Sequence, residues 1–139
     1  RLGNWNKAIE GDVMLLAGTK ASLFNAELSD TVLQSRVNKM DIHPTGPLWG
    51  KGEPLSQNEC LALEQRVLIS WGDWQCGLEK AGMKQERRAL RSYPKDFEWE
   101  YLADNELQLR FFLPAGSYAT AVMRELAVLF DASNSLPAV

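Results

Sequence analysis

The 139-residue sequence has few of the residues from which familiar catalytic sites are built. Its one histidine, His43, lies beside Pro44, and no Gly-x-Ser-x-Gly segment or reactive Cys–His pattern accompanies it. A lone histidine cannot make a nucleophile–base–acid arrangement, so we expect His43 to be a surface or packed side chain. P-loop and Gly-x-Gly-x-x-Gly segments are also absent. Hydrolytic triads and nucleotide-cofactor chemistry therefore have no support in the sequence.

Cysteines and long hydrophobic runs are scarce as well. The two cysteines, Cys60 and Cys76, lack the Cys-x-x-Cys spacing of zinc and thiol-redox sites. We expect both to be small buried side chains of a protein in a reducing compartment, the cytoplasm. No apolar run approaches the roughly 20 residues that a membrane-spanning helix needs, so no membrane partner is expected. With 45% apolar residues, the chain can still bury a core.

Positive charge is in deficit overall but concentrated in one segment. The net charge of -3 argues against a protein that binds nucleic acid over its whole surface. Residues 80–95 nevertheless hold six cations and one acid, so this segment carries +5 and the rest of the chain -8. Such a segment produces a local field that the average hides, although a solvated helix-to-strand connection explains it equally well. The cations are Lys80, Lys84, Arg87, Arg88, Arg91 and Lys95.

The hydrophobic pattern predicts an α+β chain. Short apolar runs at 13–17 and 22–26 indicate strands, and a helix is expected over about 30–38. The stretch from 41 to 49 holds a possible strand start, but its proline and glycine content predicts a loop with fixed turns that continues to 55.

The next helix has a marked start. Ser56 to Glu59 has the pattern of a capping box, in which the Ser56 hydroxyl accepts a hydrogen bond from the Glu59 backbone N–H. An apolar stripe follows at helical spacing and continues beyond Gly72, and we expect this face to be buried. Its members are Cys60, Leu63, Val67, Leu68, Trp71, Trp74 and Leu78.

After Pro94 the pattern changes to the alternation of strands, and the register of a hairpin can be predicted from it. A two-residue turn at Asp104-Asn105 would place Trp99 opposite Arg110 and mix the two faces. A three-residue loop at 103–105 instead puts all the large apolar side chains on one face. The predicted partners are Tyr101 with Leu107, Trp99 with Leu109, and Phe97 with Phe111.

The segment from Leu113 to Thr120 has the most chemical interest. It predicts a strand that runs through a tight turn into a helix, capped by Ser117 and continuing to about Phe130. Tyr118 then lies at a helix start, where its ring could stack on a base. Tyr118 as the first core residue of an amphipathic helix is the competing interpretation, and the residues alone favour it.

Residues 113–126, LPAGSYATAVMREL, resemble the C-terminal signature of the TruD family of tRNA pseudouridine synthases. Other segments agree with the family in the same order, and the resemblance extends from about Arg1 to Leu129. They are EGDVMLLAG at 10–18, GPLWG at 46–50, the helix from Ser56 to Val67, and the stretch Arg87-Arg88-Ala89 to Tyr93-Pro94.

The resemblance implies that the chain holds parts of two domains. Family members have an α/β catalytic domain of the pseudouridine-synthase type, into which a second domain, the TRUD domain, is inserted. Residues 1–92 resemble the later part of that insertion, and 93–139 the last hairpin and helix of the catalytic domain. The start at Arg1, without methionine, fits a longer protein, whose N-terminal part is then an expected partner of this chain.

The family reaction is the cofactor-free conversion of a tRNA uridine to pseudouridine, in which an aspartate attacks the nucleotide. The motif of that aspartate has no counterpart here, so the nucleophile is expected upstream of Arg1 and no catalytic residue is assigned in this chain. Tyr118 matches the aromatic position of the uridine pocket, and Arg124 and Glu125 match a pair that we interpret as structural. The resemblance makes tRNA the expected partner, with phosphate contacts from Lys84, Arg87, Arg88, Arg91 and Lys95.

Two alternatives remain from a different class. The chain could be a non-catalytic RNA-binding module with one aromatic platform, or a structural domain in which Tyr118 belongs to the core.

Overall fold

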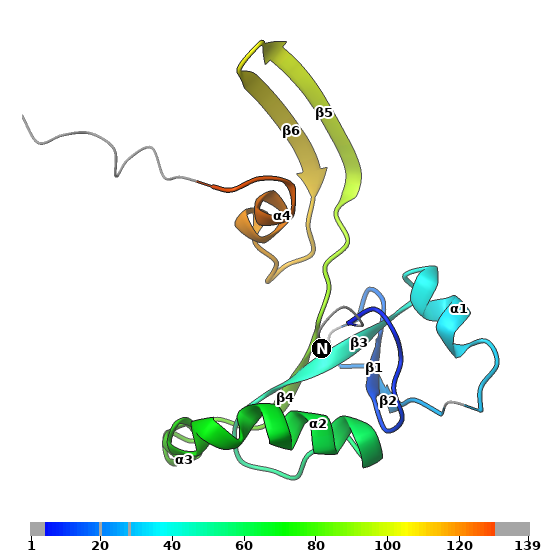
Figure 1. Cartoon of the computed structure of the whole chain (residues 1–139), viewed down its shortest axis with the longest axis vertical. Helices are drawn as coiled ribbons and strands as arrows, with labels where there is room; N and C mark the ends of the chain where they lie inside the picture. Colours follow the sequence, from blue (N-terminus) through cyan, green and yellow to red (C-terminus); the bar gives the residue numbers. More distant parts are fainter. Residues whose placement is uncertain (1–4, 20, 28, 130–139) are drawn as a thin grey trace, which may run out of the picture. The chain divides into compact units, whose positions relative to one another are not determined.

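The computed structural model describes residues 5–19, 21–27 and 29–129, and it confirms the α+β class. The chain divides into two compact units, Arg1–Arg91 and Ser92–Val139, called here the first and the second unit. Figure 1 shows the elements of each. No helix in the described ranges is long and apolar enough to cross a membrane.

The first unit is built on a four-stranded antiparallel sheet in the order β2-β1-β3-β4. Its strands and helices follow the predicted ranges closely at the start of the chain and depart from them after residue 41. The elements are β1 (Val13–Leu16), β2 (Leu23–Asn25), α1 (Leu33–Asn38), β3 (Ile42–Leu48), α2 (Asn58–Leu68), a 3-10 turn η1 (Ile69–Trp71), α3 (Gly72–Lys80) and β4 (Glu86–Ala89).

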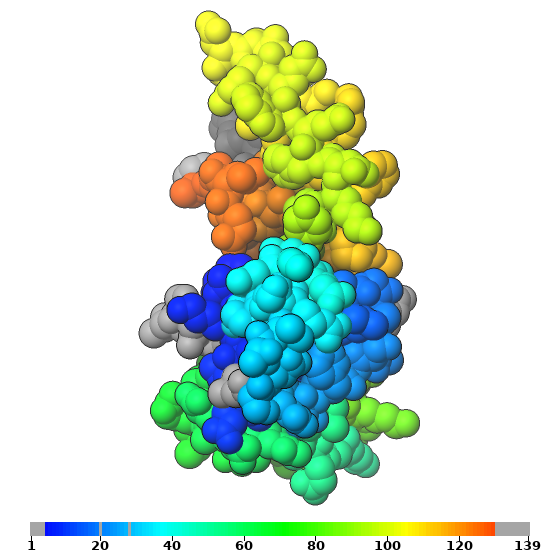
Figure 2. Space-filling view, turned by 90° about the vertical axis from the view of Figure 1, so that its right-hand side faces the viewer, coloured from blue at the N-terminus to red at the C-terminus, as the bar shows by residue number. Residues whose placement is uncertain are grey.

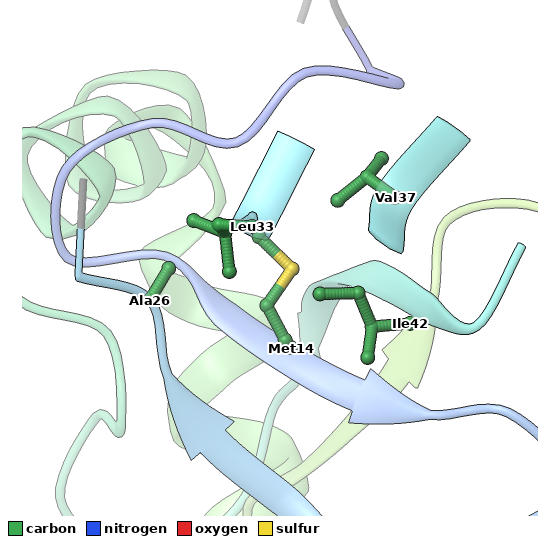
Figure 3. Close-up of a cluster of buried hydrophobic side chains, with 5 residues drawn as sticks. All are labelled: Met14, Ala26, Leu33, Val37 and Ile42. Carbon is green, nitrogen blue, oxygen red and sulfur yellow. The ribbon is translucent and has the colours of Figure 1, made fainter. Parts of the chain in front are cut away.

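The core of the first unit lies between the sheet and α1. Met14 from β1 and Ile42 from β3 are fully buried against Leu33 and Val37 of α1, and Ala26 completes the cluster (Figure 3). Alternation along β1 brings Met14 to this face, and the helical spacing of Leu33 and Val37 brings both to the facing side of α1. The sheet and α1 therefore bury their apolar faces against each other, using residues of this unit alone.

The possible strand start at 41–49 is confirmed, but the loop predicted from its proline and glycine is wrong there, because the whole of Ile42–Leu48 forms β3, one of the two inner strands of the sheet. Its beginning pairs with β1 and its end with β4, so the strand passes from one neighbour to the other. Pro44 lacks an N–H, but its carbonyl accepts a hydrogen bond from the Leu90 N–H at 2.9 Å. Gly46 lies close to the Leu90 side chain, because a Cβ there would be 2.9 Å from a methyl carbon of Leu90, which would have to shift.

The predicted capping box is also wrong. Helix α2 begins at Asn58 without a side-chain cap, and the Cys60 N–H donates to the Glu10 carbonyl at 3.0 Å. The Ser56 hydroxyl instead donates to the Glu64 carboxylate at 2.6 Å. This docking needs close backbone approach, because a Cβ on Gly11 would lie 1.9 Å from the Gln57 carbonyl oxygen. Tertiary contacts of Cys60 and Ser56 have thus replaced the predicted local bonds of the capping box.

The second unit consists of the hairpin β5 (Lys95–Ala103) and β6 (Glu106–Phe112), followed by α4 (Ala119–Leu126). The predicted register is confirmed for Trp99 with Leu109 and Tyr101 with Leu107, and the rings of Phe97 and Phe111 stack at 5.5 Å. The predicted loop is wrong: the turn has two residues, and a register shift between Tyr101 and Ala103 restores the common apolar face. Helix α4 is shorter than predicted, and Phe130 lies outside the described residues.

Candidate nucleic-acid interface

The basic segment does not present all its cations to solvent. Arg87 lies on β4 with its side chain 2% exposed, and one guanidinium nitrogen donates to Glu64 Oε1 at 2.7 Å. The same side chain donates to the Thr45 hydroxyl at 2.7 Å and to the Thr45 carbonyl at 3.0 Å. These bonds join β4, β3 and α2 from the inside. The structure thus corrects the assignment of Arg87 to phosphate binding, because its donors are used within the fold.

The partner of Arg87 is held as a carboxylate. Burial raises the pKa of Glu64, but the hydrogen bonds from Arg87 and Ser56 outweigh this effect and hold the pKa below its usual range. The Cys60 thiol lies 3.5 Å from Glu64 Oε1 and 3.6 Å from Asp12 Oδ1. Cys60 is thus buried as predicted, although beside carboxylates, whereas the prediction for Cys76 is wrong because Cys76 is exposed on α3.

Arg91 is the second basic residue that the fold uses. It is half-buried, and its guanidinium donates to the carbonyls of Val37 and Ile42 and to His43 Nδ1. His43 is thus packed against a cation, in agreement with the prediction of a packed side chain. Arg91 therefore uses part of its hydrogen-bonding capacity within the fold, and its assignment to phosphate binding stays a prediction.

The other three candidate cations are exposed. Lys84 precedes β4, Arg88 lies on β4 beside Arg87, and Lys95 begins β5 in the second unit. The alternation of β4 explains the contrast, because neighbouring residues on a strand face opposite sides and only one side meets α2. The burial of Arg87 was not predicted, because the apolar neighbours of β4 are too few to reveal which side of the strand faces inward.

Tyr118 lies at the start of α4 after a tight turn. The Ser117 N–H donates to the Pro114 carbonyl at 3.0 Å, and Gly116 has a positive φ of 85°. Tyr118 itself is extended and serves as the N-cap residue in place of the predicted Ser117. Its ring is 70% exposed, so it is not a core residue among the described parts of the second unit. An exposed ring in a fixed backbone position can serve as a stacking surface.

Arg124 and Glu125 lie in the last turn of α4, and both are exposed. With Thr120, Leu126 and Val128 they line an open hollow beside this helix. Among the described residues, no group of histidine, cysteine or acidic side chains is arranged to hold a metal ion.

Among the described residues, each unit has an apolar surface that is exposed. The hairpin face contains Trp99 and Tyr101, and Figure 2 shows atoms of the hairpin in yellow at the surface. The stripe along α2, η1 and α3 was predicted to be buried, yet Trp74 is 66% exposed and Cys60 is the member that the structure buries. Large contiguous apolar patches usually mark contact surfaces. The exposed members of the stripe are Val67, Trp71 and Trp74, with Ile69 beside them.

Comparisons with known proteins give a consistent result. The family model of tRNA pseudouridine synthase D (TruD) matches residues 1–126. The chain is 52% identical over 126 residues to tRNA pseudouridine synthase D of Hydrogenovibrio crunogenus, covering 91% of this chain and 36% of that protein. It is 48% identical over 124 residues to the protein of the same name from Nitrosococcus oceani, covering 88% of this chain and 34% of that protein.

A solved structure agrees with the sequence relatives. A crystal structure described as tRNA pseudouridine synthase D from Methanosarcina mazei aligns with a TM-score of 0.65 and 26% identity. The alignment covers 87% of this chain and 31% of that one. The chain therefore spans about a third of the length of the proteins that it matches.

Proposed function

This chain belongs to the tRNA pseudouridine synthase D (TruD) family, and from that membership we propose that it is part of an enzyme that isomerises a uridine in tRNA to pseudouridine. The family match over residues 1–126 is the observation that carries the proposal. The reaction needs no cofactor, and its nucleophilic aspartate comes from a part of the protein that precedes Arg1. The chain alone is therefore inactive, and the full-length protein acts in the cytoplasm.

Tyr118 contributes to the pocket for the target uridine. An enzyme that acts on a base within folded RNA takes the base out of its stack and gives it another surface to pack on. The exposed ring at the start of α4 is suited to that contact, and its hydroxyl can hydrogen-bond to the base or to a phosphate.

Lys84, Arg88 and Lys95 contact tRNA phosphates. All three are exposed, whereas Arg87 is buried and Arg91 is half-buried. Such contacts add affinity and salt dependence without selecting a sequence.

The remaining part of the protein covers the open apolar surfaces. A two-stranded hairpin is marginal by itself, so β5 and β6 need additional strands or a helix against the Trp99 face. We assign residues 1–92 to the later part of the inserted TRUD domain and 93–139 to the end of the catalytic domain. On this assignment the hairpin face meets the rest of the catalytic domain.

The test is an assay of the full-length protein and of residues 1–139 on unmodified tRNA containing tritium at C5 of uridine. Pseudouridine formation releases that tritium, because the ring is rejoined to the sugar through C5. We expect release by the full-length protein and none by the fragment. No release by a folded full-length protein that still binds tRNA would contradict the enzymatic proposal and favour an RNA-binding module.

A further inference from the structure

One side chain holds the end of the first unit. Arg91 is the last residue of that unit, and its guanidinium reaches three acceptors. Nε donates to His43 Nδ1 at 3.0 Å, and the terminal nitrogen donates to the Ile42 carbonyl at 2.9 Å and to the Val37 carbonyl.

The acceptors belong to two elements that are distant from Arg91 in sequence. Val37 lies in the last turn of α1, where a cation is favoured by the helix dipole, and Ile42 and His43 begin β3. The Leu90 N–H makes a backbone bond to the Pro44 carbonyl at 2.9 Å, just before this point. Arg91 therefore extends the attachment to β3 by one further residue, and the chain then runs through 92–94 to β5.

The bond to His43 requires a neutral imidazole. Nδ1 accepts a hydrogen bond only when it carries no proton, so the ring proton is on Nε2. Burial lowers the pKa of His43 and the Arg91 charge lowers it further, whereas Asp41 raises it by less. Arg36 pairs with Asp41 at 2.6 Å, and Lys39 is the other charged residue at this end of α1. His43 is thus neutral at pH 7.

We propose that Arg91, together with neutral His43, is a positioning residue that fixes the path by which the chain leaves the first unit and thereby supports tRNA turnover. The link to turnover rests on the proposed function, whereas the fixing of the path does not.

The proposal carries a defined pH dependence. Protonation of His43 removes the acceptor and places a second cation beside Arg91. Because the pKa is lower in the folded protein, the anchor is intact above about pH 6.5 and is lost as the pH falls through the lower folded value.

The experiment measures hydrogen exchange and tRNA kinetics on the full-length protein. The variants are Arg91→Ala, Arg91→Lys and His43→Asn, and Arg66→Ala on the exposed side of α2 is the matched control. Asparagine places an acceptor near the position of Nδ1 but does not titrate. Lysine keeps the charge but cannot bond to His43 and two carbonyls with the planar geometry of arginine.

We expect Arg91→Ala to raise exchange about tenfold at Leu90, whose N–H donates to the Pro44 carbonyl, while the amides of β1 keep their protection. Its kcat/KM for tRNA should fall by about tenfold, because misplaced binding groups lower the rate of positioned reactions. Arg91→Lys should lie between Arg91→Ala and the unaltered protein, and Arg66→Ala should match the unaltered protein. As the pH falls through the lowered pKa of His43, exchange at Leu90, corrected for its intrinsic rate, should rise in the unaltered protein but not in His43→Asn.

Three results would overturn the proposal: unaltered exchange at Leu90, an equal rise in β1 that indicates general destabilisation, or an unaltered kcat/KM despite raised exchange at Leu90. If Arg91→Ala does not fold, Arg91→Lys and the pH comparison with His43→Asn give the same decision. The exchange readout needs no turnover, so a failure of the enzymatic proposal is distinguishable from a failure of the anchor.

Discussion

The two units place their apolar residues in opposite situations. In the first unit, Met14, Val37 and Ile42 are fully buried between the sheet and α1. In the second unit, every residue of β5 is exposed, and Trp99 is 64% exposed. This is so although apolar and polar residues alternate more clearly along β5 than along the strands of the first unit. A hydrophobic pattern specifies which residues share a face, but the cover for that face can come from another part of the protein.

The same contrast applies to charge. Arg87 and Arg88 are neighbours on β4, yet one is buried in an ion pair with Glu64 and the other is exposed. In the first unit, α2 lies on one side of β4. The side chain of Arg87, which faces that side, is therefore buried, and those on the other side are exposed. Substitutions can therefore test which surfaces are buried by this chain itself and which are covered only by the rest of the protein.

The largest expected effect is that of Arg87→Ala in the full-length protein. Removing one member of a buried ion pair leaves Glu64 as an uncompensated charge, which costs about 3–5 kcal/mol. Urea denaturation should show this loss in the free energy of unfolding. Arg66→Ala, on the exposed side of α2, is the control and should stay within about 0.5 kcal/mol. Equal small losses for both variants would contradict the internal role of Arg87.

Trp99→Ala measures whether the hairpin face is covered in the full-length protein. If the remaining part packs on this face, the truncation creates a cavity and costs about 3 kcal/mol. If the face is open there too, the cost should be similar to that of Glu100→Ala on the opposite face, within about 0.5 kcal/mol. The same urea measurement separates the two, and the small value would contradict the proposed covering.

The smallest expected effect on stability is that of replacing Lys84, Arg88 and Lys95 together by alanine. These side chains are exposed, so unfolding should change little, but tRNA binding should weaken. The slope of log affinity against log salt should decrease by about one for each lost phosphate contact. A salt titration of tRNA binding provides the measurement. An unaltered slope would remove these three residues from the interface.

The sequence predicts most of the fold where local and tertiary preferences agree. The register of the hairpin follows from the common face of Trp99 and Tyr101, since only one pairing keeps that face apolar. Prediction from the sequence fails where a residue distant in the sequence makes the contact that a neighbouring residue was expected to make. Glu10 provides the backbone acceptor at the start of α2, and Ser56 turns to Glu64 instead of capping the helix.

The candidate site was predictable to a smaller extent. Tyr118 was identifiable from the motif around it, and the structure adds that its ring is exposed. The internal use of Arg87 and Arg91 was not predictable, because their partners Glu64 and His43 lie 23 and 48 residues away in the sequence. Charge density along a sequence does not distinguish a surface strip from a set of tertiary anchors.

The most direct test of the account compares Tyr118→Ala and Tyr118→Phe in the full-length protein by tritium release from tRNA. Since the ring is exposed at the start of α4, truncation should leave the free energy of unfolding within about 1 kcal/mol. We expect Tyr118→Ala to lower kcat/KM by at least about tenfold through loss of base stacking, and Tyr118→Phe to retain most of the activity. Unaltered kcat/KM in a folded Tyr118→Ala protein would contradict the assignment of this segment to the uridine pocket.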